Sequence, residues 1–191
     1  TGLLAPAGSA STSGGITSVS RISGSMEVWW IGADGSIQDA FWYDNANWQR
    51  FELAPPGNAS TNGGITAVSR IPGSMEVWWV GANGSIQDAF WYDNANWQRF
   101  ELAPPGNAST NGGITAVSRI PGSMEVWWVG ANGSIQDAFW YDNANWQRFE
   151  LAPPGNASTN GGITAVSRIP GSMEVWWVGA NGSIQDAFWY G

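Results

Sequence analysis

Apolar and aromatic residues occur in short runs of six or seven positions, separated by residues that favour turns. One set of four runs is ITAVSR, MEVWWV, IQDAFWY and WQRFEL, at residues 65–70, 75–80, 86–92 and 97–102. β-branched and aromatic residues dominate them, and such residues favour strands. The pattern therefore predicts four short strands and shows no helical period.

The residues between these runs predict three short turns and one long connector. Pro72 is followed by Gly73, Asn83 is followed by Gly84, and three of the four residues at positions 93–96 (DNAN) are polar. These are the residue types that tight turns and hairpins require. Residues 104–113 then form a longer stretch rich in Pro, Gly, Asn and Ser. The strands are therefore grouped in fours.

The strands are apolar on both faces. Successive side chains of a strand point to opposite sides, so Met75, Val77 and Trp79 share one face while Trp78 and Val80 share the other. A sheet with one face in water would alternate apolar and polar residues instead. Each four-stranded sheet is therefore expected to pack against a neighbour on both sides.

The whole pattern repeats every 49 residues, and residues 51–190 repeat without a substitution. A period of this size is typical of repeat architectures, in which each unit buries its apolar faces against the next. Four-stranded sheets joined by a long connector predict an all-β fold, a β-propeller of four antiparallel blades per chain. We expect one repeat domain over residues 1–191, with blade units at about 9–54, 58–103, 107–152 and 156–191.

The first residues correspond to the end of a blade. Residues 4–8 (LAPAG) match residues 53–57 (LAPPG), and the sequence ends after the third strand of the last unit. Residues 1–8 are therefore expected to complete the last blade, in their own chain or in a partner. Five positions, equivalent to residues 45–49, are absent from the joined unit. We predict an eight-bladed ring of two chains, with a four-bladed monomer as the alternative.

Composition excludes several functions. The formal charge is −8, with 15 acidic residues against seven basic ones, which disfavours nucleic acid as a partner. There is no Cys for thiolate metal sites and no His for acid–base work, and we expect neither a metal nor a cofactor. No apolar run approaches the ~18 residues of a membrane helix, and no leader peptide is evident, so we expect a soluble chain whose location is otherwise unknown.

The segment SMEVWWVGANGSIQDAFWYDNANWQRFELAPPG resembles the blades of bacterial and fungal fucose-binding β-propeller lectins. An apolar strand, a Gly-containing turn, an aromatic strand and a Trp-led outer strand follow in the same order. The near-identity of the copies is also similar to symmetrised designer propellers, which favours engineering over recent natural amplification. The resemblance implies a propeller fold and a carbohydrate ligand.

The Trp-led outer strand supplies the candidate site residues. An exposed Trp can stack on a sugar ring, and nearby Arg and Glu side chains can hydrogen-bond to hydroxyl groups. Trp97 stands beside a polar turn and is the aromatic residue expected to be most exposed, whereas Trp78, Trp79 and Trp91 are expected to fill the core. The candidate carbohydrate-binding residues are Trp48, Trp97, Trp146, Arg50, Arg99, Arg148, Glu52, Glu101 and Glu150.

Catalysis is not expected. Glu76 and Asp88 lie on adjacent strands, but identical repeats place the same group in every blade rather than assembling different groups around one substrate. We expect Asp88 to be satisfied by backbone groups or by Arg. The sequence thus favours a non-enzymatic scaffold that assembles with itself into a closed ring, with a multivalent lectin binding glycans between its blades as the alternative.

Overall fold

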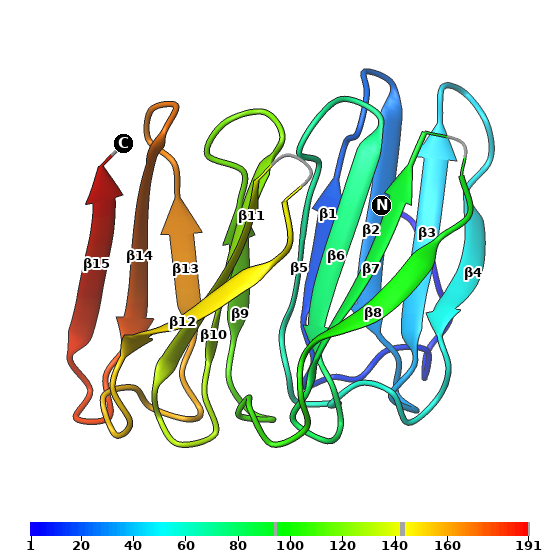
Figure 1. Ribbon diagram of the computed structural model, residues 1–191. Coiled ribbons are helices and arrows are strands. Elements are labelled where there is room, and N and C mark those ends of the chain that lie inside the picture. Colours follow the sequence, from blue (N-terminus) through cyan, green and yellow to red (C-terminus); the bar gives the residue numbers. More distant parts are fainter. Residues whose placement is uncertain (94, 142–143, 191) are drawn as a thin grey trace.

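The computed structural model describes residues 1–93, 95–141 and 144–190, and contains fifteen strands in four antiparallel sheets (Figure 1). The first two sheets have four strands each: β1 (Ile16–Val19), β2 (Ser25–Ile31), β3 (Ile37–Tyr43) and β4 (Gln49–Ala54), then β5 (Ile65–Val68), β6 (Ser74–Val80), β7 (Ile86–Tyr92) and β8 (Gln98–Ala103). The third also has four and the last has three: β9 (Ile114–Val117), β10 (Ser123–Val129), β11 (Ile135–Tyr141) and β12 (Gln147–Ala152), then β13 (Ile163–Val166), β14 (Ser172–Val178) and β15 (Ile184–Tyr190).

The predicted strands are confirmed, and the turn between β6 and β7 shows how local sequence fixes the register. The N–H of Gly81 donates to the carbonyl of Ser85 at 2.8 Å, and the side chain of Asn83 accepts from the Ser85 hydroxyl at 2.6 Å. Gly84 has a φ of 79°, a conformation that costs glycine little. The predicted turn at 93–96 includes Asn94, which lies outside the described residues.

The sheets stack face to face, as the two-sided apolar pattern predicts. Every residue of β6 is buried, including Trp78 on one face and Trp79 on the other. The innermost strands β1, β5, β9 and β13 pack side by side in that order. A Cβ on Gly64 would lie 3.1 Å from the backbone nitrogen of Ile114, so a side chain at this position would push the backbones of β5 and β9 apart.

The long connectors fix the angle between neighbouring sheets. Between β4 and β5, the N–H of Ala59 donates to Gly35 of the first sheet at 2.8 Å. One residue on, the N–H of Ser60 donates to Val80 of the second sheet at 2.9 Å. The side chain of Asn58 accepts from the indole N–H of Trp79, also at 2.8 Å. Each connector is therefore hydrogen-bonded to both sheets that it joins.

The four sheets form an open row rather than a closed ring, with the first and last sheets at its two ends (Figure 1). Ile16 is 69% exposed on the first sheet, although its counterpart Ile65 is 7% exposed inside the row. On the last sheet Ile184 is 70% exposed, while its counterpart Ile86 is fully buried. The four-bladed closed monomer is therefore wrong for this structure, because the curvature of four sheets leaves their outer faces apart.

Residues 1–8 lie outside the strands of every sheet, and the last sheet has three strands. Leu3 is 82% exposed. The option that these residues complete the last sheet of their own chain is therefore wrong, because they lead into the first sheet at the other end of the row. Their pairing with a partner's last sheet, and the eight-bladed ring, stay predictions. Within the described residues, no helix has the length and apolar character needed to cross a membrane.

Candidate ligand site between the sheets

Each sheet presents two different faces to its neighbours. We call the face toward the following sheet the leading face and the face toward the preceding sheet the trailing face. On the third sheet the leading face carries Arg119, Glu125, Trp127, Asp137, Phe139 and Phe149. The trailing face of the last sheet, opposite, carries Met173, Val175, Ala187 and Trp189. Because the repeats are identical, equivalent residues meet at each junction.

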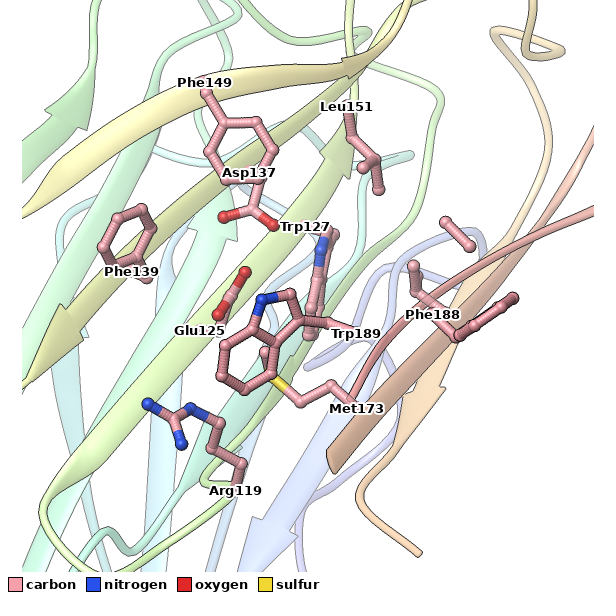
Figure 2. A pocket seen from close by; sticks show the side chains of 12 residues that line it. Arg119, Glu125, Trp127, Asp137, Phe139, Phe149, Leu151, Met173, Phe188 and Trp189 are labelled. Carbon is pink, nitrogen blue, oxygen red and sulfur yellow. The ribbon is translucent and has the colours of Figure 1, made fainter. Parts of the chain in front are cut away.

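A tryptophan that precedes the outer strand fills the first two junctions. The ring of Trp97 packs edge-on against Trp29 with centroids 6.2 Å apart, and that of Trp146 packs in the same way against Trp78 at 6.1 Å. Between the third and last sheets lies a cavity of about 530 Å³ (Figure 2).

Two carboxyl groups, one buried and one partly buried, line this cavity. Glu125 and Asp137 come from β10 and β11 of the third sheet, and Trp189 comes from the last sheet (Figure 2). Asp137 is 1% exposed, and its Oδ1 has no hydrogen-bond partner among the described residues. Burial, and then the neighbouring Glu125 carboxyl, raise the pKa of Asp137 to about 10, while burial also raises the pKa of Glu125. The site therefore holds a proton at neutral pH and can both donate and accept hydrogen bonds.

The same pair is present at the filled junctions, where it contacts no open cavity of comparable size among the described residues. Asp88 is fully buried, and neither of its oxygens has a hydrogen-bond partner in the part of the chain described. Burial and the neighbouring Glu76 raise its pKa well above the ordinary value. The expectation that backbone groups or Arg satisfy Asp88 is therefore wrong, because the register places it diagonally beside Glu76 on the leading face.

Arginine side chains cross each junction near these carboxyl groups. The guanidinium of Arg119 lies 4.8 Å from the ring centroid of Trp189 in the next sheet. Arg21 and Arg70 make the same contact at 4.9 Å with Trp91 and Trp140, the equivalent residues. An Arg at this distance over an indole ring gains a cation–π attraction. In the open cavity, a positive charge, an indole face and two carboxyl groups therefore lie close together.

The residues expected to form a sugar site separate into two groups. Trp97 and Trp146 turn inward and pack against the preceding sheet, whereas Trp48, which has no preceding sheet in the chain, is 40% exposed. The arginines are exposed and stack on a tryptophan of their own sheet: Arg50 on Trp30 at 5.3 Å, and Arg99 on Trp79 and Arg148 on Trp128, both at 5.7 Å. The glutamates Glu52, Glu101 and Glu150 are exposed and each accept from a Gln at 3.3 Å.

Sequence reasoning did not single out the residues that line the cavity. The sequence alone does not place Arg119 in a ligand site, and for the carboxyl pair it predicts a structural role rather than contact with a ligand. The signal that could have found them is the position of an acidic residue between apolar neighbours in a strand whose two faces are both buried. The side chain of such a residue, Glu125 or Asp137, must lie between two packed sheets rather than in water.

Solved structures with the same arrangement of sheets are carbohydrate-binding proteins by name. The BP39L lectin from Burkholderia pseudomallei has 18% sequence identity and a TM-score of 0.88, over 98% of this chain and 55% of that one. The six-bladed β-propeller lectin of Aleuria aurantia has 17% identity and a TM-score of 0.64, over 91% and 57%. This chain has the fold of the β-propeller lectins.

A third solved propeller, the SapL1 lectin in complex with alpha methyl fucoside, has 20% identity and a TM-score of 0.67, over 92% of this chain and 60% of that one. The chain therefore spans little more than half the length of these propellers. No family model and no curated protein sequence matches it. The expected fold class is confirmed, and each sheet is a blade.

Proposed function

We propose that this chain is a lectin and that the cavity between its third and last blades binds a sugar. The observation that carries the proposal is the lining of that cavity, which joins aromatic rings with a guanidinium, the buried carboxyl group of Asp137 and the partly buried carboxyl group of Glu125. Sugars combine apolar C–H surfaces with hydroxyl groups, and such a lining can contact both. The names of the neighbouring structures, one a complex with alpha methyl fucoside and one described by its fucose recognition, support a monosaccharide of this class.

Each lining residue has a defined part in this proposal. Trp127 and Trp189 provide indole surfaces for the apolar side of the ring, with Phe149 at the outer strand. Arg119 donates charge-assisted hydrogen bonds to hydroxyl oxygens. The pair of Glu125 and Asp137 holds one proton, so it can accept from one hydroxyl and donate to another.

Binding without hydrolysis fits this geometry. Canonical glycosidases place two carboxyl groups about 5 to 9.5 Å apart on either side of the scissile bond. Here Glu125 and Asp137 interact with each other on one face of one blade. They approach a ligand from the same side, which suits recognition of hydroxyl groups and leaves no acid and base across a bond.

The exposed outer strand is a second proposed contact surface. Arg99 and Glu101 lie on the trailing face beside Trp79, and Arg50, Glu52, Arg148 and Glu150 repeat the arrangement. This surface would give one weaker contact on each of the three blades that have an outer strand in the described residues. Identical contacts along one chain raise avidity when a ligand carries several sugars. The other proposed property, assembly with a second copy, is developed in the next subsection.

Isothermal titration with methyl α-fucoside, followed by other methyl glycosides, tests the cavity. We expect binding, and we expect Arg119→Gln to weaken it about tenfold or more, because a charged hydrogen bond is lost. Arg70→Gln is the matched control, since Arg70 holds the same position at a junction filled by Trp146. No binding by any glycoside, or equal loss in both variants, would contradict the proposed site.

A further inference from the structure

The two ends of the row expose apolar faces that are buried inside it. On the first blade, Ile16 and Met26 are exposed on the trailing face. On the last blade, Val166, Ile184 and Phe188 are exposed on the leading face. Large contiguous apolar faces are unusual on a protein that has no partner. Both ends therefore have the character of interfaces.

These two faces are complementary, because the chain already packs them together three times. At each internal junction the leading face of one blade meets the trailing face of the next, and the counterparts of the exposed residues are buried there: Ile65 and Met75 on the trailing side, Val68 and Ile86 on the leading side. A second copy that brought its first blade against the last blade would form a fourth junction from the same residue types.

The charged and aromatic residues at the ends also match. Arg168 is the counterpart of Arg119, and on the last blade it stacks on Tyr190 of its own chain at 5.1 Å. In a fourth junction it would meet the partner's Trp42, the counterpart of Trp189. The partner's Trp48 would enter beside Trp176, as Trp97 does beside Trp29.

Two copies would supply eight blades. This chain covers 54–60% of the chains of similar solved propellers, so two copies supply at least as much chain as one of those propellers has. A second copy could also supply the fourth strand of the last blade. Residues 1–5 are equivalent in the repeat to residues 50–54, which form most of the outer strand β4 of the first blade.

We propose that the leading face of the last blade binds the trailing face of the first blade in a second copy, and that two copies close into an eight-bladed ring. Residues 1–5 of each chain then add an outer strand to the partner's β15. The proposal does not depend on sugar binding. In such a ring the partner's Trp48 fills the new junction, while the cavity beside Asp137 keeps its opening, because residues 1–5 include no tryptophan.

Light scattering on a sizing column, at several protein concentrations, tests the ring. We expect twice the chain mass for the unmodified chain. Ile184→Arg and Ile16→Arg should each give the mass of a single chain, since each places a charge on one of the two faces. Tyr92→Arg, at an exposed residue away from both end faces, is the control and should keep the double mass.

Mixing the two variants separates loss of the interface from loss of folding. Ile184→Arg keeps a native first blade and Ile16→Arg keeps a native last blade, so the mixture retains one native junction. We expect a two-chain species in the mixture that neither variant forms alone. A single-chain mass for the unmodified chain, a mass that grows with concentration beyond two chains, or no pairing in the mixture would overturn the two-chain ring.

Discussion

Replacing Asp88 with Asn should stabilise the protein at neutral pH. The Asp88 side chain is fully buried beside Glu76, and its two oxygens lack hydrogen-bond partners among the described residues. A buried carboxylate without a compensating partner is costly, so the group keeps its proton in the folded chain. Asn has nearly the same shape, does not ionise, and offers an N–H to the Glu76 carboxyl.

The magnitude follows from proton linkage. Burial and Glu76 raise the pKa of Asp88 in the folded chain, while the unfolded value is about 3.9. The stabilisation from the retained proton is complete below the unfolded pKa and is lost as the pH rises toward the folded pKa. Between the unfolded and the folded pKa of Asp88, the free energy of unfolding therefore falls by about 1.4 kcal/mol for each pH unit, because the folded chain keeps one proton that the unfolded chain has lost.

Urea unfolding followed by Trp fluorescence at pH 5, 6, 7 and 8 measures this slope. In Asp88→Asn the slope should become shallower by about one proton, with the larger gain in stability at pH 8. Glu101→Gln changes an exposed carboxylate and should leave the slope as it is. An unchanged slope in Asp88→Asn, or a loss of stability at every pH, would refute the reasoning about the buried pair.

Three further substitutions test the packing, each by the midpoint and slope of urea unfolding. Trp97→Ala should cost about 3 kcal/mol, because the ring fills the first junction, and a cost below about 1 kcal/mol would contradict that role. Ser9 is the equivalent of Asn58, whose side chain accepts a hydrogen bond from the indole N–H of Trp79, whereas the indole N–H of Trp30 has no partner among the described residues. Ser9→Asn should therefore stabilise the protein by about 1 kcal/mol by giving Trp30 an acceptor, and an unchanged stability would contradict this hydrogen bond. Gly63→Ala should cost about 1–3 kcal/mol because its Cβ would lie 2.9 Å from that of Val80, and a neutral result would show that the junction can relax.

Local signals in the sequence were sufficient to predict the strands, the turns and the stacking of sheets. Asn83 and Gly84 specify a turn by themselves, and Trp78 and Trp79 on opposite faces require a neighbour on each side. Such features depend on residues close together in the chain. The number of blades in a ring depends instead on small angles between neighbouring sheets, and no single residue determines those angles.

The site could be predicted only in part, because it too depends on contacts between residues that are distant in the sequence. Trp97 precedes its strand, so alternation along β8 does not determine which way its ring turns, and the structure places it in the junction. The contact between Glu76 and Asp88 follows from the register of β6 and β7 rather than from either strand alone. The cavity is a property of two blades, and its lining residues are distant in sequence.

The stoichiometry of sugar binding tests the central claim most directly. Calorimetric titration of the chain with the best-binding methyl glycoside should give one strong site per chain, because Trp97 and Trp146 fill the first two junctions while the cavity lies between the third and last blades. Arg119→Gln should weaken that single site. A titration with no heat of binding for any sugar, or with equally strong sites on several blades, would contradict binding at the open cavity.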